Sequence, residues 1–600
     1  MTAPGADDGP PGAPPRASLR QVVGLVARAG GPSFYGVLAT MCATGLGLAA
    51  VLVLGRALAA ELARHQGRPA SLSVWVLLAG VILLVSVIAF GRMVGGGLHR
   101  LLTERVIRWC EEQITLLSAR SDLIEFDSPA FHDRLVRARR ASTSALQITL
   151  AVPRVIASAL TVAGLVVAVA LTAPVLLPVA LLSGLPVLLT GRALGERLLT
   201  FTWGHTPSDR ERQHIENILE ARDQAAEIRV FGVQEFLADR WRQLYDERIA
   251  EIAALVRGFL RRAVLAALGV AVSLTVLLVS LAWLLARGHV DLLAAATVGI
   301  SVLILSNQSQ TIAANAGALR EHSGQMADFL ATMRLLDTLP GGRRGVPAAR
   351  PLRRLEVDHL TFRYPAADRP ALRDVTFALD GDEMVAIVGH NGSGKTTLAK
   401  LLCGLYTAQS GEVRWNGGPI QGQHPGNEIG AVFQSFARYW FSAADNIRVG
   451  AVPDPGGADL ERVRAAAREA EADAFIEELP RGYDTLLAAE LAGGVDLSVG
   501  QWQRLAIARV LYRDPSLVVL DEPTASLDAE AEAKLFATLS RMRGRRAVVV
   551  ISHRFSTVRA ADRILVLEHG RLTEQGTHDE LMAARGTYAR MYSQQASAYV

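Results

Sequence analysis

The sequence predicts a two-part protein, in which an all-α membrane domain of six helices is followed by an α/β domain. Three observations on the 600 residues predict this fold class. Half of the residues are hydrophobic, and the first half of the chain contains long stretches without a charged side chain. In the second half, short apolar runs typical of buried parallel strands alternate with more polar segments. A chain of this length also exceeds what one hydrophobic core usually serves.

Charge and cysteine content exclude several other classes. The 62 basic residues nearly balance the 58 acidic ones, so no nucleic-acid partner is expected. The three cysteines, Cys42, Cys110 and Cys403, cannot build a disulfide framework and match no metal-site spacing. Residues 1–18 are rich in proline, glycine and alanine and lack an apolar centre, which indicates a disordered tail and not a signal peptide.

Five charge-free runs indicate the membrane spans. A helix needs about 20 apolar residues to cross a bilayer, so four of these runs fit one span each. The run over residues 155–191 is long enough for two helices, with a tight turn at Thr172-Ala173-Pro174 if the first helix begins near Leu146. We therefore expect a membrane domain over residues 19–339, with spans at about 34–56, 71–91, 146–171, 174–192, 263–286 and 291–316.

Two long connections, residues 92–145 and 192–262, separate these spans into groups. They carry 21 arginines, whereas the charged short connections carry four. The positive-inside rule therefore places both long connections and both termini in the cytoplasm, and the protein in the cell membrane as a multi-pass protein. The first connection has a turn sequence at its midpoint, Phe126-Asp127-Ser128-Pro129.

The sixth predicted span contains a polar cluster, residues 306–311 together with Asn315. Gln308, Thr311 and Asn315 share one face at helical spacing. Amides that face lipid are costly, so we expect this face to line a wet cavity or another helix. Substrate contact and interhelical hydrogen bonding both remain open.

A turn-rich linker over residues 340–352 precedes the second domain, residues 353–600. A strand at 383–388 and a helix at 397–405 flank the segment Gly389-His390-Asn391-Gly392-Ser393-Gly394-Lys395-Thr396. This strand–loop–helix arrangement matches the phosphate-binding loop of P-loop NTPases. Its glycines let backbone N–H groups close on phosphates at the positive end of a helix. We expect Lys395 to reach the β- and γ-phosphates and Thr396 to ligate Mg²⁺.

A second apolar strand, residues 516–522, ends in two acids. Asp521 is expected to hold Mg²⁺ beside the phosphate loop. Glu522 follows where a carboxylate can orient or deprotonate an attacking water. ATP and Mg²⁺ are therefore the expected cofactors.

The segment Leu497-Ser498-Val499-Gly500-Gln501, followed by Gln503-Arg504-Leu505, resembles the signature motif of ATP-binding cassette (ABC) proteins. The resemblance extends over nearly the whole chain and is that of an exporter-type half-transporter, a six-helix transmembrane domain followed by an ABC ATPase domain. It implies a Q-loop at Gln434, a D-loop at Asp528, a switch histidine at His553 and an adenine-stacking Tyr364. Segments 126–133 and 226–233 match the two coupling helices.

In this family two chains pair, as a homodimer or a heterodimer, and each ATP lies between the phosphate loop of one chain and the signature of the other. The resemblance implies catalytic roles for Glu522, His553, Gln434 and Asp528, and metal contacts from Thr396, Gln434 and Asp521. The implied nucleotide contacts are Tyr364, Gly389, His390, Asn391, Gly392, Ser393, Gly394, Lys395, Thr396, Thr397, Ser498, Gly500 and Gln501.

One departure stands out. Val499 occupies a position that is usually glycine in the family, which puts a side chain where close backbone approach is normal. Residues 490–494 also lack the usual charged pattern before the signature. Hydrolysis is still expected because Glu522 and His553 are present.

The leading functional hypothesis is an ATP-driven exporter of a peptide, a lipid or a hydrophobic drug. Residues 432–439 and 500–504 are similar to stretches in exporters of modified peptides such as lanthipeptides. The alternatives are an exporter-fold importer, for example of siderophores, and an ATP-gated channel or regulator. A soluble ABC ATPase is opposed by the six predicted spans.

Overall fold

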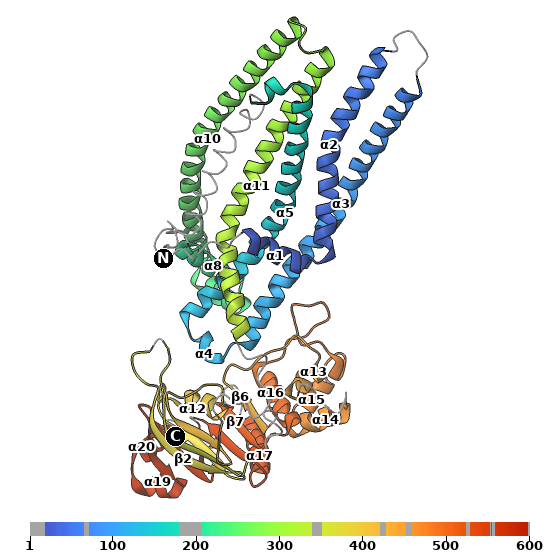
Figure 1. The fold of residues 1–600 in the computed structure, drawn as a ribbon. Helices are drawn as coiled ribbons and strands as arrows, with labels where there is room; N and C mark the ends of the chain where they lie inside the picture. The colour runs from blue at the N-terminus through green and yellow to red at the C-terminus, as the bar shows by residue number, and fades with distance from the viewer. Residues whose placement is uncertain are drawn as a thin grey trace. The chain divides into compact units, whose positions relative to one another are not determined.

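The computed structural model describes residues 19–64, 71–178, 206–338, 351–365, 367–420, 428–451, 459–523, 529–552, 554 and 558–597. The chain divides into two compact units (Figure 1). The first comprises Met1–Ala119 and Asp133–Thr338, and the second comprises Arg120–His132 and Leu339–Val600. The predicted tail, residues 1–18, and nearly all of the predicted linker lie outside the described residues.

The first unit is helical; the last residue of α3, Arg120, and the first turn of α5, which begins at Pro129, belong to the second unit. Its helices are α1 (Leu19–Gly30), α2 (Pro32–Arg64), α3 (Leu72–Arg120), α5 (Pro129–Thr172), α8 (Thr206–Glu220), α9 (Arg222–Phe231), α10 (Gln234–Ala286) and α11 (Leu292–Thr338). Within the described residues, α2, α3, α5, α10 and α11 are each long and apolar enough to cross a membrane. The first unit is therefore a helical membrane domain.

α5 ends at Thr172 and is followed by a short 3₁₀ turn, Pro174–Leu176, at the position where a hairpin is expected. A proline has no N–H to donate and restricts the residue before it, which explains why the helix stops there. Most of the fourth predicted span, 174–192, lies outside the described residues. The number of six spans and the domain limits therefore stay predictions.

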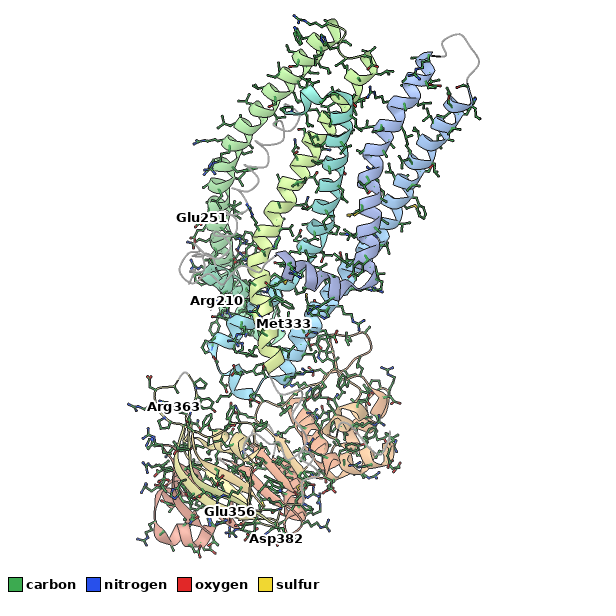
Figure 2. The ribbon with its side chains drawn as sticks, viewed as in Figure 1. Arg210, Glu251, Met333, Glu356, Arg363 and Asp382 are labelled. Atoms are coloured by element: carbon green, nitrogen blue, oxygen red, sulfur yellow. The ribbon has the colours of Figure 1, made fainter. Side chains whose placement is uncertain are left out.

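The core of the first unit lies where α1, α2, α3, α5 and α11 meet. It contains Val26, Val37, Leu102, Ile148 and Phe329, all almost fully buried. By contrast, α10 exposes most of its apolar side chains, as expected for a helix that faces lipid. Ion pairs tie the polar ends of the helices together; Arg210 of α8 donates to Asp133 of α5 at 2.9 Å, and Arg210 is labelled in Figure 2.

The polar cluster of α11 divides between two environments. Thr311 and Asn315 bond to backbone carbonyls one turn earlier, with Thr311 Oγ1 3.1 Å from the Asn307 oxygen and Asn315 Nδ2 2.7 Å from the Thr311 oxygen. Gln308 is half-buried, whereas Asn307 and Gln310 are exposed. Within the described residues, Asn307 and Gln310 therefore give α11 an exposed polar face.

The described residues of the second unit form two sheets. The strands are β1 (Arg354–Phe362), β2 (Leu372–Asp380), β3 (Met384–Val388), β4 (Ser410–Trp415), β5 (Gly418–Pro419), β6 (Ile429–Val432), β7 (Leu517–Asp521), β8 (Ala547–Ile551), β9 (Arg563–Glu568) and β10 (Arg571–Gly576). An antiparallel sheet has the order β2-β1-β4-β5, and a six-stranded sheet has the order β10-β9-β3-β8-β7-β6. In the larger sheet β9, β3, β8, β7 and β6 are parallel, so their carboxyl ends share one edge.

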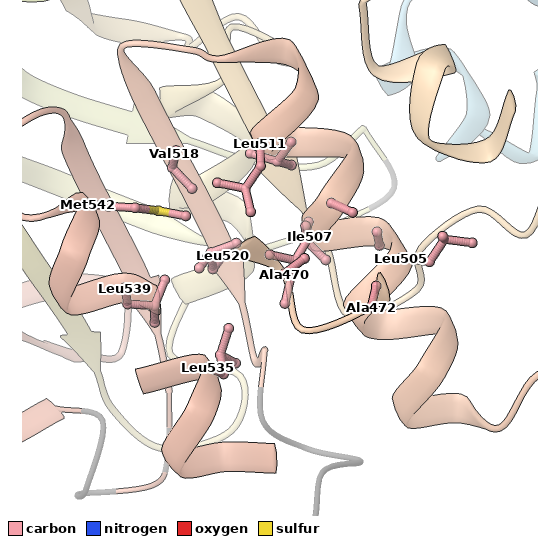
Figure 3. Close-up of a cluster of buried hydrophobic side chains, with 14 of the residues drawn as sticks. Ala470, Ala472, Leu505, Ile507, Leu511, Val518, Leu520, Leu535, Leu539 and Met542 are labelled. Carbon is pink, nitrogen blue, oxygen red and sulfur yellow. The ribbon is translucent and has the colours of Figure 1, made fainter. Parts of the chain in front are cut away.

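The second unit also contains the helices α4 (Leu123–Phe126), α12 (Lys395–Leu402), α13 (Ala443–Arg448), α14 (Leu460–Glu469), α15 (Asp473–Glu477), α16 (Val499–Arg513), α17 (Ala529–Met542), α19 (His578–Ala584) and α20 (Thr587–Ser597). Among these helices, α12, α16, α17 and α19 contact strands of the larger sheet, and α13 and α14 contact α16. Alternate residues of β7 enter different cores, because strand side chains alternate between faces. Val518 and Leu520 pack with α16 and α17, including Leu511 and Leu539 (Figure 3). This packing holds the end of β7, Asp521, in a defined position.

Candidate nucleotide site

The loop between β3 and α12 is built around the side chain of Lys395. Its Nζ donates to the carbonyl oxygens of Gly389 at 2.9 Å and His390 at 3.1 Å, so the loop curls around the ammonium group. Gly392 and Gly394 have φ of +78° and +103°, a region that glycine adopts without strain. The N–H groups at the start of α12 therefore point into the concave side of the loop, which suits a phosphate.

A pocket of about 760 Å³ opens at this loop. Its lining residues come from widely separated parts of the second unit and are Tyr364, Ala371, Asn391, Gly392, Gly394, Lys395, Thr396, Thr397, Gln434 and Glu522. The Tyr364 hydroxyl lies 3.0 Å from Thr397 Oγ1, which orients the phenol ring at one end of the pocket. Gly389, His390 and Ser393 complete the loop behind the lining residues. The structure thus brings most of the predicted nucleotide contacts together.

Two acids follow each other at the carboxyl end of β7. Asp521 is buried at 2% exposure, and burial raises its pKa above the ordinary value. Glu522 has a φ of +52°, which is uncommon for a residue with a Cβ and turns the chain so that this carboxyl lines the pocket. Gln434 Nε2 lies 3.4 Å from Glu522 Oε2. Strained backbone of this kind is concentrated at functional sites.

The donor set at this edge fits Mg²⁺. Asp521 Oδ2 is buried and has no hydrogen-bond partner among the described residues, while the same carboxylate accepts a bond from the Thr396 side chain. In the described ranges no group of three His, Cys, Asp or Glu side chains lies close enough to hold a metal ion. Mg²⁺ usually binds through one or two carboxylates plus substrate phosphates, so nucleotide phosphates would have to complete this site.

The charge of Lys395 is balanced across the pocket. Burial lowers the pKa of its ammonium group, and Glu522 and Asp521 act in the opposite direction. Only some of the N–H groups of Lys395 donate to the loop carbonyls. A phosphate that enters the loop therefore meets a buried cation that can still donate a hydrogen bond.

The signature segment forms the start of α16. Ser498 caps this helix, with its Oγ 3.3 Å from the Gln501 N, and Gln501 Oε1 accepts from the Ser498 N at 2.9 Å. The Val499 side chain is 45% exposed. The described residues that line the pocket do not include Ser498, Gly500 or Gln501. The predicted residues Asp528 and His553 lie outside the described residues.

Comparisons with known proteins agree with this geometry. The family model described as ABC transporter matches residues 372–525. That range contains the phosphate loop, Gln434, the signature segment and both acids after β7. The C-terminal unit therefore contains an ABC ATPase domain.

Known relatives of the chain include bacterial lipid flippases. An ATP-dependent lipid A-core flippase of Alkalilimnicola ehrlichii is 36% identical over 387 residues, which is 61% of this chain and 62% of that protein. The flippase of Pseudomonas aeruginosa is 42% identical over 243 residues, 40% of this chain and 39% of that protein. The match thus spans less than two thirds of each relative. The relatives give no specific support for a lanthipeptide exporter.

A solved structure extends the comparison over both units. The structure of a bacterial Atm1-family ABC exporter with ATP bound covers 96% of this chain and 99% of its own, with a TM-score of 0.73 and 23% sequence identity. The chain therefore has the fold of an ABC exporter, with a helical membrane domain before the ABC ATPase domain.

The structure adds residues that motif spacing did not identify. Ala371 lines the ATPase pocket although no motif contains it. Arg154 lies within the expected third span and is exposed on α5. An arginine at such a position is itself a signal of function, because charges within spans are rare.

The glycines of the loop allow a direct test of its geometry. A Cβ added at Gly394 would lie 2.6 Å from the Ala371 oxygen and 2.7 Å from Leu372 Cδ2, whereas a Cβ at Gly392 meets nothing within 4 Å. Gly392→Ala is expected to destabilise the ATPase domain by about 1–2 kcal/mol through backbone strain alone. Gly394→Ala is expected to cost about 1–3 kcal/mol more because of the clash. Denaturant unfolding of the two purified variants measures this difference, and equal destabilisation would contradict the loop geometry.

Proposed function

We propose that this chain is one half of an ATP-driven exporter that moves an amphiphilic lipid with an anionic headgroup across the cell membrane. The observation that carries the proposal is the combination, in one chain, of a phosphate-loop pocket and several helices apolar enough to span a bilayer. The flippase relatives support a lipid as the substrate class.

The proposed active form is a dimer with two shared ATP sites. α16 has fifteen residues, begins at Val499 and is capped by Ser498, so the N–H groups of its first turn suit a γ-phosphate. Because this helix start does not line the pocket of its own chain, we assign it to the nucleotide held by a second chain. That second chain is either another copy or a related half-transporter.

In the proposed hydrolysis, Glu522 orients a water and accepts its proton as the water oxygen attacks the γ-phosphorus. The bond from that phosphorus to the ADP oxygen breaks, and ADP leaves with its electron pair. Gln434 positions the Glu522 carboxylate from 3.4 Å away. Mg²⁺, held by Asp521 and Thr396, would neutralise phosphate charge when bound. We assign Asp528 and His553 to the same site.

Closure of the two ATPase domains around ATP is proposed to reopen the membrane domain on the opposite side, and hydrolysis resets it. ATP can drive this change only through its different affinities for the two states. The long connections, the ATPase domain and both termini are proposed to face the cytoplasm, as the arginine distribution favours.

Two features of the membrane domain support an anionic amphiphile. Arg154 is exposed within the apolar part of α5, and Asn307 and Gln310 are exposed on α11. A guanidinium group binds phosphate or carboxylate through paired hydrogen bonds, and the amides offer further donors. We therefore favour a lipid over a modified peptide or a hydrophobic drug.

The test is lipid movement in proteoliposomes whose ATPase domains face outward. With Mg²⁺ and ATP outside, headgroup-labelled phosphatidylglycerol is expected to move from the outer to the inner leaflet faster than labelled phosphatidylcholine. Arg154→Gln is expected to slow the anionic probe by about 10-fold, because one charge-assisted contact is lost. The control Arg287→Gln, which removes an arginine that stacks on Trp283 after α10, should leave the rate unchanged.

Several outcomes would contradict the proposal. Movement towards the ATP side would indicate an importer. Equal movement with a non-hydrolysable ATP analogue would indicate a channel. Movement of a labelled peptide but of neither lipid would indicate a peptide exporter.

A further inference from the structure

Tyr406 connects the wall of the nucleotide pocket to a segment from the first half of the chain. The residue follows α12 and is buried at 2% exposure. Its ring stacks on Phe362 with centroids 5.1 Å apart and meets the Tyr364 ring edge-on at 5.8 Å. Tyr364 lines the pocket, whereas Tyr406 lies behind it. The Tyr406 ring therefore cannot shift without moving the wall on which an adenine would stack.

The hydroxyl of Tyr406 bonds to two charged side chains. It donates to Asp127 Oδ2 at 2.5 Å, and Lys400 Nζ donates to it at 3.1 Å. Burial and the bond to Asp127 raise the pKa of Tyr406, so the phenol keeps its proton and remains a donor. Short hydrogen bonds to a carboxylate are stronger than neutral ones, which makes this a directional link.

Asp127 belongs to the segment Arg120–His132, which packs with the second unit. Leu123 and Ile124 of α4 pack against the same apolar cluster that contains Tyr406 and Phe362. The segment is covalently continuous with α3 before it and α5 after it, two of the helices apolar enough to cross a membrane. The pocket wall is thus joined, through one phenol, to the connection between two proposed spans.

We propose that Tyr406 is a positioning residue that transmits adenine binding at Tyr364 to the segment Arg120–His132 through its hydrogen bond to Asp127. This inference rests on the proposed function. An adenine on Tyr364 fixes that ring, the ring holds Tyr406 against Phe362, and the hydroxyl then holds Asp127. Because the Tyr406 ring meets Tyr364, where the adenine is expected to stack, this link responds more strongly to the base than to the phosphates.

The first test uses hydrogen–deuterium exchange in the full chain with the Glu522→Gln substitution, so that ATP is not consumed. Saturating ATP is expected to slow exchange in residues 120–132 by at least about 5-fold, whereas inorganic tripolyphosphate, which lacks adenine, should not. Tyr406→Phe keeps the ring but removes the hydroxyl, and it is expected to abolish the ATP response. Because this readout needs no transported substrate, its failure is distinguishable from failure of the proposed function.

Tyr483→Phe is the matched control. Tyr483 is also buried in the second unit and donates to a carboxylate, Asp473, at 2.6 Å, but neither residue belongs to the pocket or to the segment. This variant should keep the ATP response of residues 120–132. A retained response in Tyr406→Phe, or an equal loss in both variants, would overturn the inference.

Enzyme kinetics distinguish a loss of coupling between ATP hydrolysis and transport from a general loss of ATPase activity. In proteoliposomes, Tyr406→Phe is expected to change the kcat and KM of basal ATP hydrolysis by less than about 2-fold, while transport per ATP hydrolysed falls by at least about 10-fold. Asp127→Ala should produce the same loss. The double variant should be no worse than either single variant, because both substitutions remove the same Tyr406–Asp127 hydrogen bond. Additive losses, or a fall in basal kcat equal to the fall in transport, would contradict a positioning role.

Discussion

Replacing Glu522 with glutamine is expected to lower ATP turnover by about 10²–10⁴-fold while ATP remains bound. The amide preserves the size of the side chain and an oxygen within reach of Gln434, which lies 3.4 Å from the carboxylate. It cannot accept a proton from water at neutral pH, and it removes a negative charge beside the phosphates. Steady-state phosphate release and retention of radiolabelled ATP measure the two effects, and lipid movement should cease with turnover.

The control for this substitution is Glu478→Gln, an exposed acid that follows α15 and does not line the pocket. It makes the same chemical change and should leave turnover within about 2-fold of the unsubstituted protein. Turnover in Glu522→Gln equal to that of this control would remove Glu522 from its assigned role.

Lys395→Ala is expected to act on ATP binding before it acts on turnover. The ammonium group donates to two loop carbonyls, and it is the buried cation nearest the expected phosphates. Hydrogen bonds to charged groups contribute about 1.5–3 kcal/mol, so the dissociation constant of ATP should rise by about 10–150-fold. Equilibrium binding of a fluorescent ATP analogue measures this change.

Lys534→Ala, which removes an exposed lysine of α17, serves as the charge-matched control. An unchanged dissociation constant in Lys395→Ala would show that the loop binds phosphate through its backbone alone. Glu522→Gln and Lys395→Ala together separate ATP binding from hydrolysis, because the first is expected to change turnover and the second the affinity for ATP.

Much of the site could be predicted because its signals are local in sequence. The phosphate loop needs glycines at fixed offsets and a lysine at the helix start. The segment between β3 and α12 has these residues at the required offsets. The capping of α16 by Ser498 and Gln501 follows equally from residues three apart. The spans could be expected because a charge-free run of about 20 residues has few other uses.

The orientation of individual side chains could not be predicted in this way. Periodicity indicates that Gln308 and Asn315 share one face, and both are half-buried; the pattern did not indicate that Asn307 and Gln310 are exposed on α11. The difference arises because packing against neighbouring helices decides which side of a long helix is covered. For the same reason, the exposure of Arg154 on α5 became evident only in the folded chain.

By itself the sequence determined the fold class and predicted the chemistry of each motif, because both depend on short-range composition and spacing. Only the tertiary structure decided that Tyr364, Gln434 and Glu522 meet in one pocket, and that Tyr406 reaches Asp127 across 279 residues. It also gave Glu522 its left-handed backbone. Such contacts are decided by how the sheet edges and helices pack, and no local pattern specifies which distant partner that packing brings within hydrogen-bond distance.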